Sequence, residues 1–276
     1  MSDVWKDEGK HVESGYRIGS LSDYTPRKNE RHEGHAGNLA PSSGVTYKHI
    51  GGLGKVVTEL DLIINGPRKY PELWKHLGCQ STRGVLLSGP PGCGKTLLAQ
   101  AIANETGRKV CLVQGAEIKG WRQGASEGNL VSAFESVRPN GILIIDEIDA
   151  IGGKREQMVN ETNTSIVSTL CSLLDGAKNK DETIIIATTN KPHMLDSALR
   201  RPGRFDVEIQ ILPPDVTGRT QIFAIHTAGM PLASDVVLGA LAKRAHGFTG
   251  ADIAGACAHL QQLLLKRAVE KIEKGT

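Results

Sequence analysis

The sequence predicts an α/β fold, in which a parallel five-stranded sheet flanked by helices is followed by a small all-helical lid domain. Two observations predict it. From residue 83 onward, short apolar runs alternate with segments of helical spacing, which is typical of a parallel sheet covered on both faces. After Pro213 and Pro214 the strand-like runs stop, and only helical patterns remain.

Each element follows from its own pattern. The strands are expected at residues 83–88, 110–113, 141–146, 183–188 and 206–211. The helices between them are expected at 94–106, 127–137 and 160–175. Three further helices are expected at 217–228, 234–245 and 250–271, the last with an apolar stripe of Ile253, Cys257, Leu260, Leu264 and Ala268.

The domain boundaries follow from these elements. Residues 1–44 show little periodicity and mix small polar residues with charges, so we expect a mobile tail or a short docking segment there. Residues 45–214 then form the α/β domain, and residues 215–276 form the helical lid domain.

Composition excludes several classes of protein. A net charge of +3 without a long basic run gives no support for specific nucleic-acid binding. The five cysteines form no C-x-x-C pair, which indicates reduced thiols rather than disulfides or zinc ligands. No apolar run reaches the length of a membrane span, and the N-terminus has no signal-peptide core. A cytoplasmic protein is the expectation.

The run Gly89-Pro-Pro-Gly-Cys-Gly-Lys-Thr96 has the spacing G-x-x-x-x-G-K-[ST] of a phosphate-binding loop, or P-loop. Its glycines allow tight bends that point backbone N–H groups at phosphate oxygens. Lys95 is expected to reach the β- and γ-phosphates, and the Thr96 hydroxyl to ligate Mg²⁺. The fold predicted is therefore that of a P-loop NTPase, with a nucleoside triphosphate and Mg²⁺ as ligands. The residues expected to bind the nucleotide here are Gly89, Pro90, Pro91, Gly92, Cys93, Gly94, Lys95, Thr96 and Leu97.

Cys93 lies inside this loop and has two interpretations. It is either a small filler residue or a thiol whose oxidation blocks nucleotide binding. The usual inertness of cysteines favours the filler.

Two strands are expected to end in catalytic groups. Asp146 and Glu147 follow the apolar run of the third strand, where Asp146 is suited to Mg²⁺ and Glu147 to deprotonating an attacking water. Asn190 follows the fourth strand and is suited to positioning that water or sensing the γ-phosphate. Beyond it, Arg200, Arg201 and Arg204 form a cationic cluster of the kind that recognises phosphate.

The order of these motifs resembles that found in the AAA ATPases, in particular in the branch that contains valosin-containing protein and the proteasomal regulatory ATPases. The resemblance covers a single AAA module, from about residue 45 to the end. Its pieces are Ile50–Gly52, Gly89–Thr96, Ile145–Ile151, Ala187–Asn190, Leu195–Asp206, Ile225–Thr227 and Gly247–Asp252.

The resemblance implies an ATP-hydrolysing ring, a homohexamer with ATP at its subunit interfaces. Lys95, Thr96, Asp146, Glu147 and Asn190 would then act within one subunit. Arg201 and Arg204 match the arginine fingers that reach the neighbouring subunit's nucleotide. Positions that contact adenine and ribose are matched by Ile50, Gly51, His226, Gly250 and Ala251.

The chain departs from the family pattern in two places. The substrate-gripping pore loop corresponds to Gly120–Glu127, where Trp121 stands one residue further from Gly124 than usual. Either the loop carries an extra residue, or Arg122 and Gln123 occupy the gripping positions. Thr164 and Ser165 stand where relatives often carry paired arginines that bridge subunits.

The predicted function is an ATP-driven motor that unfolds or translocates protein substrates through a central pore, with protein substrates or adaptors as partners. The altered pore loop and the absent arginine pair leave a second interpretation open. In it, the protein is a nucleotide-switched scaffold that assembles and releases partners without threading them. Filament disassembly is a third interpretation, which the tail does not favour because it lacks the basic character expected for binding acidic filaments.

Overall fold

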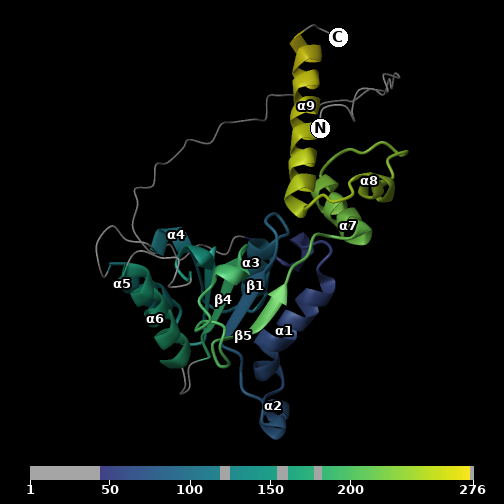
Figure 1. Ribbon diagram of the computed structural model, residues 1–276. Helices are drawn as coiled ribbons and strands as arrows, with labels where there is room; N and C mark the ends of the chain where they lie inside the picture. Colours follow the sequence, from purple (N-terminus) through teal and green to yellow (C-terminus); the bar gives the residue numbers. More distant parts are fainter. Residues whose placement is uncertain (1–43, 119–124, 154–160, 177–181, 274–276) are drawn as a thin grey trace. The chain divides into compact units, whose positions relative to one another are not determined.

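The computed structural model describes residues 44–118, 125–153, 161–176 and 182–273 (Figure 1). Five parallel strands form one sheet in the order β2-β3-β4-β1-β5. Their bounds are Gly84–Ser88 for β1, Val110–Gln114 for β2, Ile142–Asp146 for β3, Ile184–Thr189 for β4 and Phe205–Gln210 for β5. The predicted strands and the predicted α/β class are confirmed.

Helices cover both faces of the sheet because the central strands carry buried apolar side chains on both sides. In β3, Leu143 and Ile145 pack in one buried cluster while Ile142 and Ile144 pack in another. The first cluster contains the apolar side chains of α5 (Ala125–Val137) and α6 (Glu161–Gly176). The second contains those of α1 (Gly54–Lys69) and α3 (Lys95–Glu105). Figure 1 shows α5 and α6 on one side of the sheet and α1 on the other.

Three helices follow the sheet. They are α7 (Val216–Thr227), α8 (Leu238–Arg244) and α9 (Gly250–Glu273), and they share a small core around Phe223, Ala242 and Ile253. Asp215 caps α7 by accepting a hydrogen bond from the Gly218 N–H at 2.7 Å. The predicted change from strands to helices near residue 215 thus agrees with where β5 ends and α7 begins, although the domain boundary itself remains a proposal.

Two predictions about the helical segment were wrong in detail. The helix expected from residue 234 begins only at Leu238, because Ser234 and Asp235 form a turn, the conformation that these residue types favour. In α9, Leu260 and Leu264 were expected to join the buried stripe but are 45% and 46% exposed. The short α7 and α8 cover only the first turns of this 24-residue helix, so the stripe continues beyond the packing that its periodicity implied.

The helices before β1 and the short α4 (Gly115–Ile118) were not predicted from the sequence. The first of the missed helices, α1, has buried Leu60 and Ile64 at helical spacing, a signal that was present in the sequence. The second, α2, spans Pro71–Leu77. Among the helices that the structure describes, none combines the length and apolarity that crossing a membrane requires.

Candidate functional site

The carboxyl ends of three neighbouring strands meet at one edge of the sheet. Strand β4 lies between β3 and β1, and Ser88 pairs with Thr189 in register. The residues that follow these strands therefore come together: the phosphate loop after β1, Glu147 after β3 and Asn190 after β4. This is the edge at which α/β proteins place their ligands.

A cavity of about 440 Å³ opens at this edge and extends to the helical segment. Most of the residues predicted to bind nucleotide or metal line it, in contrast to Gly89, Pro90 and the two arginines. The predicted residues that line it are Ile50, Gly51, Pro91, Gly92, Cys93, Gly94, Lys95, Thr96, Leu97, Asp146, Glu147, Asn190, His226, Gly250 and Ala251.

The phosphate loop needs its glycines for two separate reasons. Gly89 and Gly92 have φ values of 144° and 76°, in the region that side chains disfavour. A Cβ on Gly89 would also lie 2.0 Å from the Ile211 carbonyl oxygen, and one on Gly92 would lie 2.7 Å from the Thr249 hydroxyl. The backbone can thus follow a tight path around an anion that a side chain would obstruct.

Lys95 points back into the loop. Its Nζ donates hydrogen bonds to the carbonyls of Gly89 at 2.9 Å and Pro90 at 2.7 Å. The side chain is buried, at 7% exposure, and this burial lowers the pKa of Lys95, against the opposing effect of Cys93 and nearby carboxylates such as Asp146. The ammonium group is therefore held by carbonyl oxygens in a place where phosphate oxygens would be stronger partners.

The side chains of Thr96 and Asp146 place two oxygen atoms that are suited to binding a metal ion next to each other. The Thr96 hydroxyl donates to Asp146 Oδ1 at 2.7 Å, across a sequence distance that only the sheet closes. Hydroxyl and carboxylate oxygens suit Mg²⁺, which usually takes few protein ligands and completes its shell with phosphate and water. Among the described residues there is no cluster of three or more His, Cys, Asp or Glu side chains suited to holding a metal by themselves. The pair fits a cation that arrives with a nucleotide.

Thr188 also belongs to this site, although the sequence analysis did not select it. Its hydroxyl donates to Asp146 Oδ1 and accepts the backbone N–H of Glu147 at 3.1 Å. The signal available in the sequence was a polar residue within the apolar run of β4. The next residue, Thr189, donates to Asp149 at 2.8 Å instead.

The other end of the cavity comes from the segment before α1 and from α7 and α9. Gly51 lies so close to α7 that a Cβ would be 2.8 Å from the Ile222 side chain. The Gly52 N–H donates to Gln221 on α7 at 2.8 Å. Several apolar lining residues here were not predicted from the sequence, because their roles depend on how α7 and α9 pack. They include Leu53, Ile222, Ile225 and Ala254.

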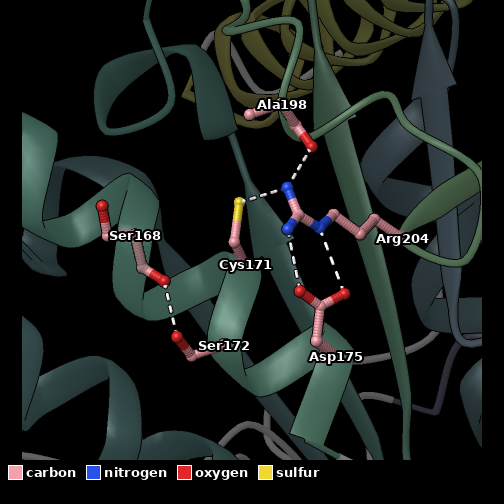
Figure 2. Close-up of polar contacts among 6 residues, drawn as sticks. All are labelled: Ser168, Cys171, Ser172, Asp175, Ala198 and Arg204. Atoms are coloured by element: carbon pink, nitrogen blue, oxygen red, sulfur yellow. Dashed lines mark hydrogen bonds and ion pairs between the residues drawn. The ribbon is translucent and has the colours of Figure 1, made fainter.

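The two predicted arginine fingers differ in their surroundings (Figure 2). Arg204 makes a bidentate contact with Asp175 on α6, with Nε–Oδ1 and Nη2–Oδ2 distances of 3.2 and 2.8 Å. Its Nη1 donates to the Ala198 carbonyl at 2.6 Å and to Cys171 Sγ at 3.0 Å. The hydrogen bonds to Asp175 raise the pKa of Arg204. The side chain of Arg201 is exposed.

Arg204 thus holds α6 to the segment that precedes β5 within its own chain. Neither arginine lines the cavity of the single chain, so the structure of one subunit does not test their predicted action on a neighbour. Trp121 and Arg122, the predicted pore-loop residues, lie outside the described residues.

Comparison with known proteins gives one family and two informative relatives. Residues 85–212 match the family described as "ATPase family associated with various cellular activities (AAA)". The chain is 45% identical over 231 residues to the Cell division cycle protein 48 homolog of Archaeoglobus fulgidus, covering 83% of this chain and 32% of that protein. It is 42% identical over 245 residues to Protein CdcH of Halobacterium salinarum, covering 88% of this chain and 33% of that protein. The chain spans about a third of the length of these relatives, which confirm the resemblance drawn from the motifs.

Cys93 should react slowly with thiol reagents. Burial raises the pKa of its thiol, an effect that the nearby Lys95 only partly offsets, so less thiolate is present at neutral pH. Exposed Cys79 should be labelled first by a maleimide at pH 7, and labelling of Cys93 should accelerate as the pH rises towards its pKa. Mass spectrometry of the peptides gives the order of labelling. Equal labelling rates for Cys93 and Cys79 at pH 7 would restore the interpretation of Cys93 as a redox-sensitive thiol.

Proposed function

This chain belongs to the AAA family of ATPases, which hydrolyse ATP, and from that premise we propose that it is a ring-forming motor that remodels protein substrates. The observation that carries the proposal is that one cavity is lined both by the phosphate loop, Asp146, Glu147 and Asn190 and by residues of α7 and α9. A nucleotide in this cavity would contact the sheet and the helical segment at once.

The loop residues would bind the triphosphate. The loop leads directly into α3, and the N-terminus of this 11-residue helix favours an anion because its first backbone N–H groups have no partner within the helix. Lys95 would exchange its two carbonyl partners for phosphate oxygens. Thr96 and Asp146 would hold Mg²⁺, which, when bound, neutralises part of the phosphate charge.

Hydrolysis would depend on Glu147 and Asn190. The Glu147 side chain is exposed and lines the cavity, so its carboxylate can accept a proton from a water that attacks the γ-phosphate. Asn190 lines the same cavity at the end of the adjacent strand and would hold that water by its amide. Arg201, and Arg204 if it leaves Asp175, would supply positive charge from a neighbouring subunit of a homohexamer.

Coupling to movement would run through the start of α9. The Ala251 N–H donates to the Gly92 carbonyl at 3.0 Å, which joins the helical segment directly to the phosphate loop. Ile50, Gly51, His226, Gly250 and Ala251 would enclose the nucleoside. Loss of the γ-phosphate would change the fit of the loop, and α7 to α9 would move with it.

Replacing Glu147 with Gln tests the hydrolytic role. The amide cannot take a proton, so ATP turnover should fall by about a hundredfold or more while ATP binding persists. The measurements are steady-state phosphate release and the affinity for a fluorescent ATP analogue. Glu59→Gln, on the exposed face of α1, serves as the control and should match the wild type. A Glu147→Gln protein that turns over ATP at the wild-type rate contradicts the assignment.

Mixing two inactive variants tests whether the site is shared between subunits. Lys95→Ala should lose nucleotide binding, and Arg201→Ala should lose hydrolysis without loss of thermal stability, because Arg201 is exposed. A mixture should regain part of the ATPase activity, since an intact Lys95 in one subunit can meet an intact Arg201 in the next. Arg204→Ala should lose about 1 kcal/mol of stability as well, because it leaves Asp175 without this partner. Complete absence of recovery in the mixture argues against a finger acting between subunits.

Substituting Trp121 separates threading from the scaffold interpretation. If this residue grips a polypeptide, Trp121→Ala should abolish substrate remodelling and leave the ATPase rate within about twofold. The proteins retained by Glu147→Gln in ATP supply the substrates for that assay. Unchanged remodelling by Trp121→Ala favours a nucleotide-switched scaffold that releases partners without threading them.

A further inference from the structure

Thr188 is a hydroxyl residue buried within an apolar strand. It is 1% exposed, and the three residues before Ala187 in β4 are all isoleucine. A buried hydroxyl costs free energy unless both its donor and its acceptor capacity are used. Here both are used, and both partners belong to the two consecutive acidic residues at the end of β3.

The first partner is the carboxylate of Asp146. Its Oδ1 accepts hydrogen bonds from the Thr188 hydroxyl and from the Thr96 hydroxyl, which approach from β4 and from α3. Two donors from different elements fix the position of this oxygen better than one does. Thr188 therefore restricts the side chain that is suited to holding Mg²⁺.

The second partner is the backbone of Glu147. This residue has a φ of 53°, in the left-handed region that non-glycine residues seldom adopt, and it precedes the short 3₁₀ turn Ile148–Ala150. Its N–H donates to the Thr188 hydroxyl at 3.1 Å. That bond holds the peptide group directly before an unfavourable conformation, and the conformation determines where the Glu147 side chain leaves the backbone.

We propose that Thr188 is a positioning residue, which fixes the Asp146 carboxylate and the Glu147 backbone through one hydroxyl group. The proposal rests on the proposed function of the cavity as the ATP site. Thr188 would contact neither the phosphates nor the attacking water. Its contribution would be to keep the group that holds Mg²⁺ and the group that accepts the proton in a constant relation.

Three substitutions separate this role from simple core packing. Thr188→Val keeps the shape and removes the hydroxyl, and Thr188→Ser keeps the hydroxyl and removes the methyl group. Thr189→Val is the matched control, because Thr189 is equally buried in the same strand but donates to Asp149 instead. All three should remain folded, which a thermal unfolding curve checks.

The first measurement needs neither metal nor nucleotide. In the wild type, the peptide that contains Glu147 should be protected from amide hydrogen exchange by the bond to Thr188. Thr188→Val should speed exchange there by about tenfold, and Thr188→Ser should keep the slow rate. Thr189→Val should leave exchange of this peptide unchanged.

The second measurement is the affinity for a fluorescent ADP analogue with Mg²⁺ and with EDTA. The ratio of the affinity with Mg²⁺ to the affinity in EDTA should be about tenfold smaller for Thr188→Val than for the wild type. The affinity in EDTA alone should stay within about twofold of the wild type. Thr188→Ser should restore the gain, and Thr189→Val should retain it. A folded Thr188→Val protein with a wild-type Mg²⁺ effect and wild-type exchange at Glu147 overturns the proposal.

Failure of the proposed function would look different. If Lys95→Ala bound the analogue as tightly as the wild type, the cavity would not be the nucleotide site. The exchange measurement on Thr188→Val would still decide whether this hydroxyl fixes the Glu147 backbone.

Discussion

Burial of the central strands on both faces is the constraint on which the rest of this molecule depends. In β3, alternate side chains enter two separate cores, one shared with α5 and α6 and the other with α1 and α3. In a parallel strand buried in this way, polar side chains reach solvent or a ligand mainly at the ends of the strand. Asp146, Glu147 and Asn190 therefore lie at one edge of the sheet, where the loop before α3 also begins.

This edge carries its polar groups as a connected set rather than as separate residues. Thr96 and Thr188 both donate to Asp146, and Thr188 also accepts the Glu147 N–H. Lys95 is held by the carbonyls of its own loop. The hydroxyl–carboxylate bonds among Thr96, Thr188 and Asp146 fix these side chains relative to one another across three elements of the fold.

The two arginines of the segment before β5 have different surroundings within one chain. Arg204 joins α6 to the segment before β5 through Asp175 and the Ala198 carbonyl (Figure 2). Arg201, three residues earlier in the chain, is exposed. Two arginines that match one family motif therefore differ within a single subunit: one makes contacts within its own chain, and the other is exposed to solvent. Arg204 stabilises the segment that contains Arg201, and of these two arginines Arg201 is the more accessible cation.

Sequence by itself determined the five strands, their order along the chain and the residues of the phosphate loop, because these depend on local patterns: apolar runs and fixed glycine and lysine spacing. It did not reveal Thr188, the apolar lining from Ile222 and Ile225, or the difference between Arg201 and Arg204. Each of these depends on residues far apart in the chain, such as β4 beside β3 or α6 beside the segment before β5. The exposed Leu260 and Leu264 show the same limit, since periodicity identifies an apolar stripe but only tertiary packing decides which part of it is covered.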